Sequence, residues 1–145
     1  YGMENLERAM HGILKETQRA CHICCGYPNS LDSEHYKKAD LDAYDKIADL
    51  VEDSSIDEVS LEDSHRPLDL KLLEKFKKTN VIMGLIDVAK SRVESVEEVQ
   101  KRIREVLGHI DEERLIAAPD CGLGFFDRDQ AKQKMQILSK AVKNF

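Results

Sequence analysis

The chain alternates short apolar runs with longer stretches in which apolar residues recur at every third or fourth position. The runs predict β-strands that begin near residues 19, 56, 81 and 115. The run at 81–86 is apolar almost throughout, which is typical of a parallel strand covered on both faces. The third-or-fourth spacing predicts an amphipathic helix before the first strand and one after each strand. The predicted order is therefore one helix followed by four strand–helix units.

The predicted helices are marked by capping residues and by the spacing of their apolar side chains. Ser95 and Glu98 form a capping-box pattern that opens one helix, and the last helix begins at Asp127. The helix after the second strand is indicated by three spaced apolar residues: Leu70, Leu73 and Phe76. In the last helix we expect four side chains to face the core: Ala131, Met135, Leu138 and Val142.

Alternating strands and helices predict an α/β fold with a parallel sheet and right-handed crossovers. Two architectures fit, namely an open, doubly wound sheet of four strands or one half of an eight-stranded barrel. A whole barrel takes about 250 residues, whereas this chain has 145. In the second case residues 1–145 form a single unit, a half barrel whose open edges the rest of a longer protein or a second copy would cover.

The composition narrows the class of partner. The chain carries 22 basic and 28 acidic side chains, which gives a net charge of −6. It therefore lacks the basic surface that binds nucleic acid or anionic membranes. No apolar run approaches the ~18 residues of a membrane span, and the first residues do not resemble a signal peptide. We expect a cytoplasmic protein that acts on small molecules.

Residues that zinc accepts follow three of the four predicted strands. In parallel α/β folds, ligands bind at the carboxyl ends of the strands. His22 and Cys24 lie two positions apart at the end of the first strand, so both side chains project from the same face. Glu62 follows the second strand and Cys121 follows the fourth. These residues supply the four ligands that a tetrahedral zinc ion requires.

In a reducing compartment the four cysteines favour metal binding or reactive thiols over disulfides. Cys21 and Cys25 project opposite to Cys24, so we expect these two to pack against helices. Two thiolates and one carboxylate would give a zinc site one excess negative charge, which suits a nucleophilic thiolate better than water activation. A substrate thiolate that displaced Glu62 would preserve that charge, so Glu62 is a candidate catalytic residue. Asp87, which follows the third strand at the same edge, is a second candidate.

Three segments resemble a known family. His22-Ile23-Cys24, the Glu62 that follows Val59-Ser60-Leu61, and Pro119-Asp120-Cys121-Gly122-Leu123 are similar to the zinc-binding motifs in the carboxyl-terminal barrel of cobalamin-independent methionine synthase. The resemblance covers nearly all of the chain. It implies that residues 1–145 are a single unit, the carboxyl-terminal half of a (βα)8 TIM barrel with its last four βα units. It also implies that zinc is bound by His22, Cys24, Glu62 and Cys121. It also implies an enzyme that transfers a methyl group from a methylated folate to homocysteine, making methionine.

The loop after the third strand departs from this family. The family's loop reads Asp-[Ile/Val]-His-Ser, and that His assists catalysis, whereas here Asp87-Val88 is followed by Ala89-Lys90. One open alternative is therefore a relative that alkylates another thiol or uses another donor. A second is a noncatalytic, zinc-binding half barrel that oligomerises, most simply as a homodimer. A thiol redox protein is disfavoured, because Cys21 and Cys24 have the Cys-x-x-Cys spacing but lie within a predicted strand.

Overall fold

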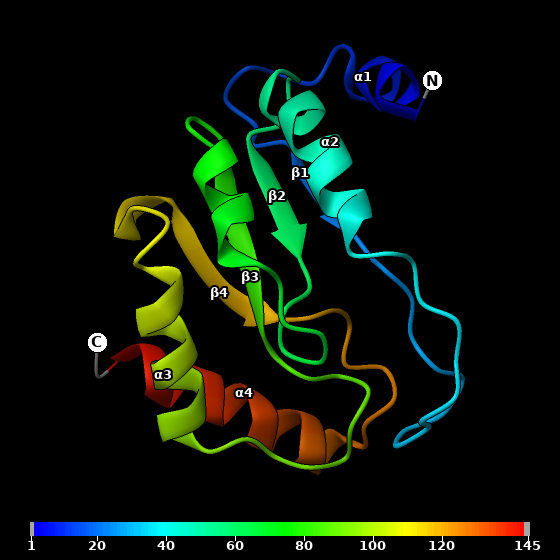
Figure 1. The fold of residues 1–145 in the computed structure, drawn as a ribbon, viewed down its shortest axis with the longest axis vertical. Helices are drawn as coiled ribbons and strands as arrows, with labels where there is room; N and C mark the ends of the chain where they lie inside the picture. Colours follow the sequence, from blue (N-terminus) through cyan, green and yellow to red (C-terminus); the bar gives the residue numbers. More distant parts are fainter. Residues whose placement is uncertain (1, 144–145) are drawn as a thin grey trace.

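A parallel sheet of four strands runs through the computed structural model, which describes residues 2–143 (Figure 1). The strands lie side by side in chain order: β1 (Ala20–Ile23), β2 (Glu58–Leu61), β3 (Asn80–Ile86) and β4 (Leu115–Pro119). Each begins within two residues of its predicted start. The structure therefore confirms the α/β class and the parallel alternation. Within the described residues the sheet is open, because β1 and β4 each pair with a single neighbour.

Helices connect the strands as predicted, except that one of them is a 3₁₀ helix instead of an α-helix. Their bounds are α1 (Gly2–Met10), α2 (Asp42–Glu52), α3 (Val96–Val106) and α4 (Arg128–Lys143). The segment between β2 and β3 forms a 3₁₀ helix, η1 (Leu70–Lys75), rather than an α-helix, and Phe76 follows its end. A second short 3₁₀ helix, η2 (Glu112–Arg114), leads into β4. No helix among residues 2–143 is both long enough and apolar enough to span a bilayer.

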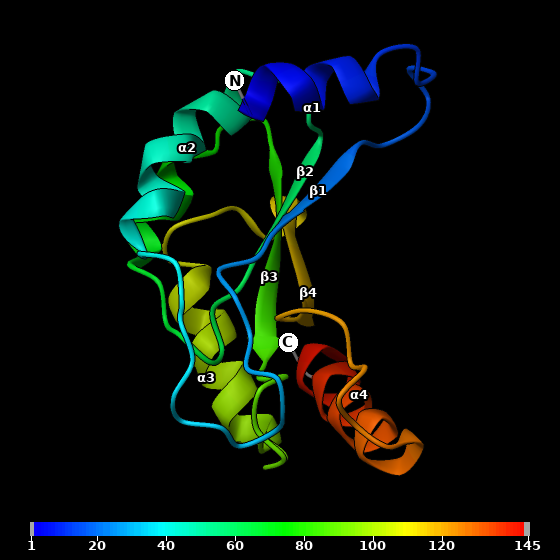
Figure 2. The ribbon, with the colours of Figure 1, turned by 90° about the vertical axis from the view of Figure 1, so that its right-hand side faces the viewer.

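The two faces of the sheet have different surroundings. Figure 2 shows α2 and α3 on the same side of the strands. On that side the alternating residues of β2 and β3 are fully buried, among them Val59, Val81 and Met83. The other face carries His22 of β1, which is exposed, and Ser60 of β2, which is half-buried. The strand alternation thus separates a packed core from an accessible face that bears polar side chains.

Helix α4 uses a different face from the predicted one. Met135 and Val142, which were expected to face the core, are 42% and 45% exposed. The buried residues are Lys134, Leu138 and Ala141, which also follow helical spacing. The prediction is confirmed for Leu138 and wrong for Met135 and Val142, because it placed Lys134 on the solvent-facing side. Lys134 is buried because its ammonium group is paired with Glu94 and with two backbone carbonyls.

Candidate metal centre

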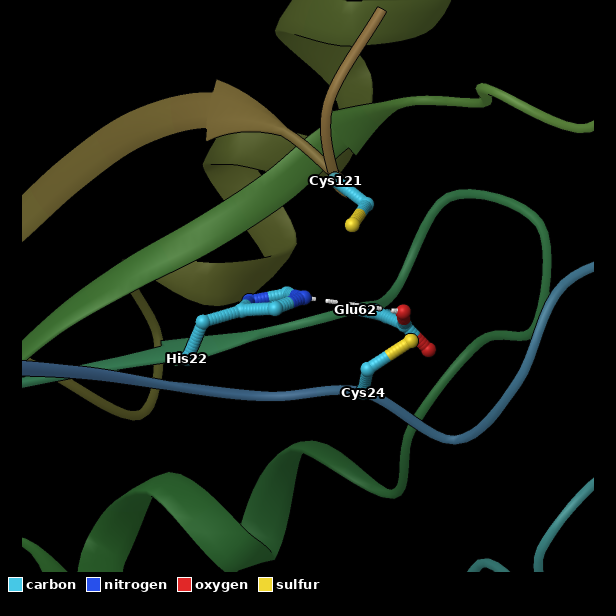
Figure 3. A group of neighbouring side chains, drawn as sticks. All are labelled: His22, Cys24, Glu62 and Cys121. Atoms are coloured by element: carbon cyan, nitrogen blue, oxygen red, sulfur yellow. Dashed lines mark ion pairs between the residues drawn. The ribbon is translucent and has the colours of Figure 1, made fainter. Parts of the chain in front are cut away.

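Four side chains converge beyond the carboxyl ends of β1, β2 and β4 (Figure 3). They are the four ligands predicted from the sequence: His22, Cys24, Glu62 and Cys121. One candidate ligand atom from each lies within 4.8 Å of the others. Figure 3 shows Cys121 arriving from the β4 side, whereas His22 and Cys24 rise from β1 on the other side of Glu62. A parallel sheet with this strand order is what brings residues from opposite ends of the chain to one edge.

The orientation of His22 is set by the neighbouring strand. The β1–β2 register pairs His22 with Ser60, and His22 Nδ1 lies 2.9 Å from Ser60 Oγ. The other ring nitrogen, Nε2, faces Glu62 Oε1 at 3.8 Å. When Nδ1–H donates to the serine hydroxyl, Nε2 keeps a lone pair that is directed at the centre of the group. The imidazole is therefore held with one nitrogen available to bind a cation.

Glu62 is a buried carboxylate with one satisfied and one unsatisfied oxygen. The residue is 1% exposed. Its Oε2 accepts hydrogen bonds from the Cys25 backbone N–H at 2.9 Å and from the Cys25 thiol. Its Oε1 is buried and has no hydrogen-bond partner. An unpaired buried carboxylate oxygen is costly, so a cation bound beside Oε1 fits the residues that are present.

The two thiols of the group complete a donor set typical of zinc, with two sulfurs, one imidazole and one carboxylate. Desolvation of the sulfur, followed by the nearby Glu62 carboxylate, raises the pKa of Cys24 to about 12. Without a cation this cysteine is therefore a neutral thiol at physiological pH. Metal binding would require the thiolate, so loading the site releases a proton from Cys24.

Asp87 lies in an adjoining group rather than among the four. It stands at the end of β3, and its Oδ1 accepts from the backbone N–H of Ala89 at 2.7 Å. Candidate ligand atoms of Asp87, His65 and Asp120 lie within 4.8 Å of one another. His65 Nδ1 donates to Asp120 Oδ2 at 2.9 Å, and the ring of Tyr27 packs against the imidazole. The structure thus places Asp87 near the candidate metal centre but outside it.

Some residues that support the group were not singled out from the sequence. Ser60 was assigned no role from the sequence, although it lies on β2, two positions before Glu62, and pairs in register with His22. Cys25 was expected only to pack against helices. It is 7% exposed, as expected, but it also binds Glu62. The alternation of strand residues could have identified Ser60, whereas the Cys25 contact depends on the turn after β1.

The sequence matches the model of one protein family, described as "Cobalamin-independent synthase, Catalytic domain", over residues 9–144. Among similar curated proteins, the methionine synthase of Thermococcus kodakarensis is 35% identical over 141 residues. The methionine synthase of Pyrococcus furiosus is 34% identical over 142 residues. Each alignment covers 97% of this chain and 37% of the relative. The chain therefore spans a little over one third of the length of these curated relatives.

Solved structures give the same result for the fold. A B12-independent methionine synthase from Shewanella sp. W3-18-1, in complex with selenomethionine, superposes with a TM-score of 0.81 at 27% identity. That match covers 99% of this chain and 42% of the other. A Listeria monocytogenes protein described as a putative vitamin-B12-independent methionine synthase superposes with a TM-score of 0.65 at 16% identity and supports the fold alone. Four parallel strands with alternating helices thus match part of a TIM barrel, and the sheet is not closed.

Proposed function

The chain belongs to the cobalamin-independent synthase catalytic-domain family, and on that premise we propose that it carries the zinc site of a methyltransferase acting on a thiol. The thiol would be homocysteine or a similar small molecule, and the methyl donor would be methyltetrahydrofolate, so that the product is methionine. The observation that carries the proposal is the buried, unpartnered Oε1 of Glu62, which faces His22 Nε2 and shares its group with two cysteines.

Each residue of the group has a distinct part in this proposal. His22 Nε2, the two sulfurs of Cys24 and Cys121, and Glu62 Oε1 would hold the metal. A bound zinc ion would supply a site at which a substrate thiol is held as a reactive thiolate. Glu62 is the ligand best placed to leave, because Cys25 still binds its Oε2 when Oε1 is released. The carboxylate would then stay in place while the substrate sulfur occupies the fourth position.

The donor set favours transfer to sulfur over hydrolysis. Two thiolates and a carboxylate bring three negative charges to a divalent ion, which weakens its ability to acidify bound water. Exchanging Glu62 for a substrate thiolate would leave the formal charge of the ligand set unchanged. Ser60 would keep His22 oriented in both cases.

The test is homocysteine binding to the full chain loaded with cobalt(II) as a spectroscopic substitute for zinc. We expect homocysteine to strengthen the sulfur-to-cobalt charge-transfer band and homoserine, its oxygen analogue, to leave the band unchanged. Methionine formation from methyltetrahydrofolate, followed by mass spectrometry, then tests the donor. We expect slow turnover, because the chain spans 37% of the curated relatives' length. A charge-transfer band that does not change when homocysteine is added would contradict the proposal.

A second candidate function is a noncatalytic zinc module that assembles with a copy of itself. The observation that favours it is the open sheet, since in the described part of the chain β1 and β4 each leave one edge unpaired. Light scattering separates the two candidates when combined with the cobalt assay. A dimer that binds metal but ignores homocysteine supports assembly, whereas a homocysteine response supports the methyltransferase.

A further inference from the structure

We propose that Asp120 is a positioning residue that fixes the Cys121 thiol relative to Glu62, and that Gly84 is required to make room for it. The proposal rests on the proposed function, because it assumes that Cys121 and Glu62 bind the same metal ion. Asp120 and Gly84 are not among the four candidate ligands of the metal, and the proposal gives each of them a role.

The need for such a residue follows from the sheet order. Glu62 follows β2 and Cys121 follows β4, and these strands do not pair because β3 lies between them. The regular hydrogen bonds of the sheet therefore do not connect the two loops directly. Any contact that joins the two loops has to pass over the end of β3.

The carboxylate of Asp120 makes these contacts. Its Oδ1 accepts from the backbone N–H groups of Asp63 and Ser64 at 3.0 and 2.9 Å. Its Oδ2 accepts from the backbone N–H and the Nδ1–H of His65, both at 2.9 Å. Asp120 thus binds the three residues that directly follow Glu62, and it directly precedes Cys121. One side chain connects the two ligand loops through four hydrogen bonds.

The surroundings of Asp120 leave it little freedom. The residue is 0% exposed, and its own N–H donates to the Ile86 carbonyl of β3 at 3.0 Å. The ring of His65 is nearly buried, with 2% of its side chain exposed. Hydrogen bonds to a carboxylate in such a dry environment are strong and directional. The position of the Cys121 backbone is therefore set by the loop that carries Glu62.

Gly84 of β3 supplies the space that the carboxylate occupies. A Cβ atom at this position would lie 2.2 Å from Asp120 Oδ1 and 2.7 Å from Asp120 Cα. The first distance is far below a van der Waals contact, and the second involves backbone that cannot easily move. The β3–β4 pairing is also irregular between Gly84 and Ile86. A side chain at position 84 would force the Asp120 segment, and with it Cys121, away from the sheet.

The experiment is cobalt and zinc titration of the full chain and of two variants, Asp120→Asn and Gly84→Ala. Asn at position 120 keeps one acceptor oxygen but turns an NH2 group toward the two His65 donors. Cys121→Ser provides the spectrum of a site with one thiolate. Asp53→Asn is the matched control, because Asp53 is exposed and follows α2 before β2 begins, at the opposite end of the sheet. Far-ultraviolet circular dichroism checks that each metal-free variant is folded.

We expect both variants to bind cobalt and zinc about 10 to 100-fold more weakly, as supporting residues of metal sites do. At saturating cobalt, the charge-transfer band should fall toward that of Cys121→Ser, to roughly half, since one of two thiolates would be lost. A purely structural role would lower stability without changing the spectrum of the loaded protein. If either variant does not fold, His65→Ala removes one of the four hydrogen bonds and should give the same change at smaller size.

Two contrary results are distinguishable. If the unmodified chain binds cobalt while the folded variants match it in affinity and spectrum, the role of Asp120 is wrong and the proposed function stands. If the unmodified chain binds neither cobalt nor zinc, the proposed function fails first.

Discussion

Two buried glutamates show how differently this fold uses the same side chain. Glu94, 6% exposed, lies after β3, and its two oxygens accept hydrogen bonds from Lys134 Nζ at 3.1 and 3.0 Å. The Asp87 backbone N–H also donates to it at 2.9 Å. Glu62, 1% exposed, lies after β2. Within residues 2–143 its carboxylate forms no ion pair with a lysine or arginine. Its Oε1 has no hydrogen-bond partner.

The difference separates a structural pair from a candidate site. A buried carboxylate is stable when a buried cation and backbone donors satisfy it, as Lys134 satisfies Glu94. Lys134 also donates to the carbonyls of Asp87 and Arg92, so this pair joins α4 to the loop after β3. At Glu62 the protein supplies sulfur and imidazole instead of an ammonium group. The proposed metal site would account for a carboxylate left in that environment, because a bound cation would supply the missing positive charge.

The largest effect is expected when a sulfur is removed from the Glu62 group. Cys24→Ser and Cys121→Ser should each lose the zinc that the unmodified chain retains, because an alcohol is a far poorer zinc ligand than a thiolate. Metal analysis after dialysis measures the change. Cys21→Ser is the matched control, because Cys21 lies outside the group and should leave zinc content unchanged. If Cys24→Ser and Cys121→Ser both retain all of their zinc, Glu62 does not belong to a metal site and its contrast with Glu94 is lost.

The next largest effect is a loss of stability when Lys134, the partner of Glu94, is replaced. Lys134→Met leaves a buried carboxylate without its cation, so the free energy of unfolding should fall by about 3–5 kcal/mol. Urea denaturation of the metal-free chain measures it. Lys140→Met, at an exposed position of the same helix, should change stability by less than about 0.5 kcal/mol. Equal stability of the two variants would show that the Lys134–Glu94 pair does not support the fold.

A smaller effect is expected at Ser60. Ser60→Ala removes the oxygen that orients His22 and should weaken zinc binding by about 10 to 100-fold without loss of folding. Ser60→Thr keeps the hydroxyl and should restore most of the affinity. Ser64→Ala serves as the control, since Ser64 donates to Asp120 through its backbone N–H rather than its side chain. Competition with a chromophoric chelator measures all three, and an unchanged affinity for Ser60→Ala would count against the assigned orientation.

The smallest effect is expected when Glu62 is replaced in the metal-free chain, and it is compared with the same replacement at Glu94. Glu62→Gln removes a buried, unpaired charge, so metal-free stability should stay within about 1 kcal/mol of the unmodified chain or rise. Glu94→Gln breaks a satisfied pair and should be clearly destabilising. Thermal unfolding of both metal-free variants gives the contrast. A larger loss from Glu62→Gln than from Glu94→Gln would reverse the interpretation.

The sequence was sufficient to predict the features that depend on local pattern. Strand runs such as 81–86 are recognisable because burial on both faces demands continuous apolar residues. The convergence of Glu62 and Cys121 follows from a rule of parallel sheets, since carboxyl ends of strands share one edge. These predictions need only the order of elements and the residue type at each strand end.

Other features depend on contacts between distant segments and could not be predicted. Lys134 is buried only because Glu94 lies opposite it, and helical spacing alone assigns a lysine to the surface. Asp120 was noticed as part of a motif, yet its four hydrogen bonds involve a loop more than fifty positions away. The short segment after β2 became a 3₁₀ helix although its apolar spacing suits an α-helix. Tertiary packing decides each of these cases.

The most direct test of the central claim is X-ray absorption spectroscopy at the zinc edge on the full chain after zinc loading and dialysis. The account predicts about one zinc per chain, with two sulfur ligands at ~2.3 Å and two nitrogen or oxygen ligands at ~2.0–2.2 Å. A chain that retains no zinc, or a zinc ion surrounded only by oxygen and nitrogen, would contradict it.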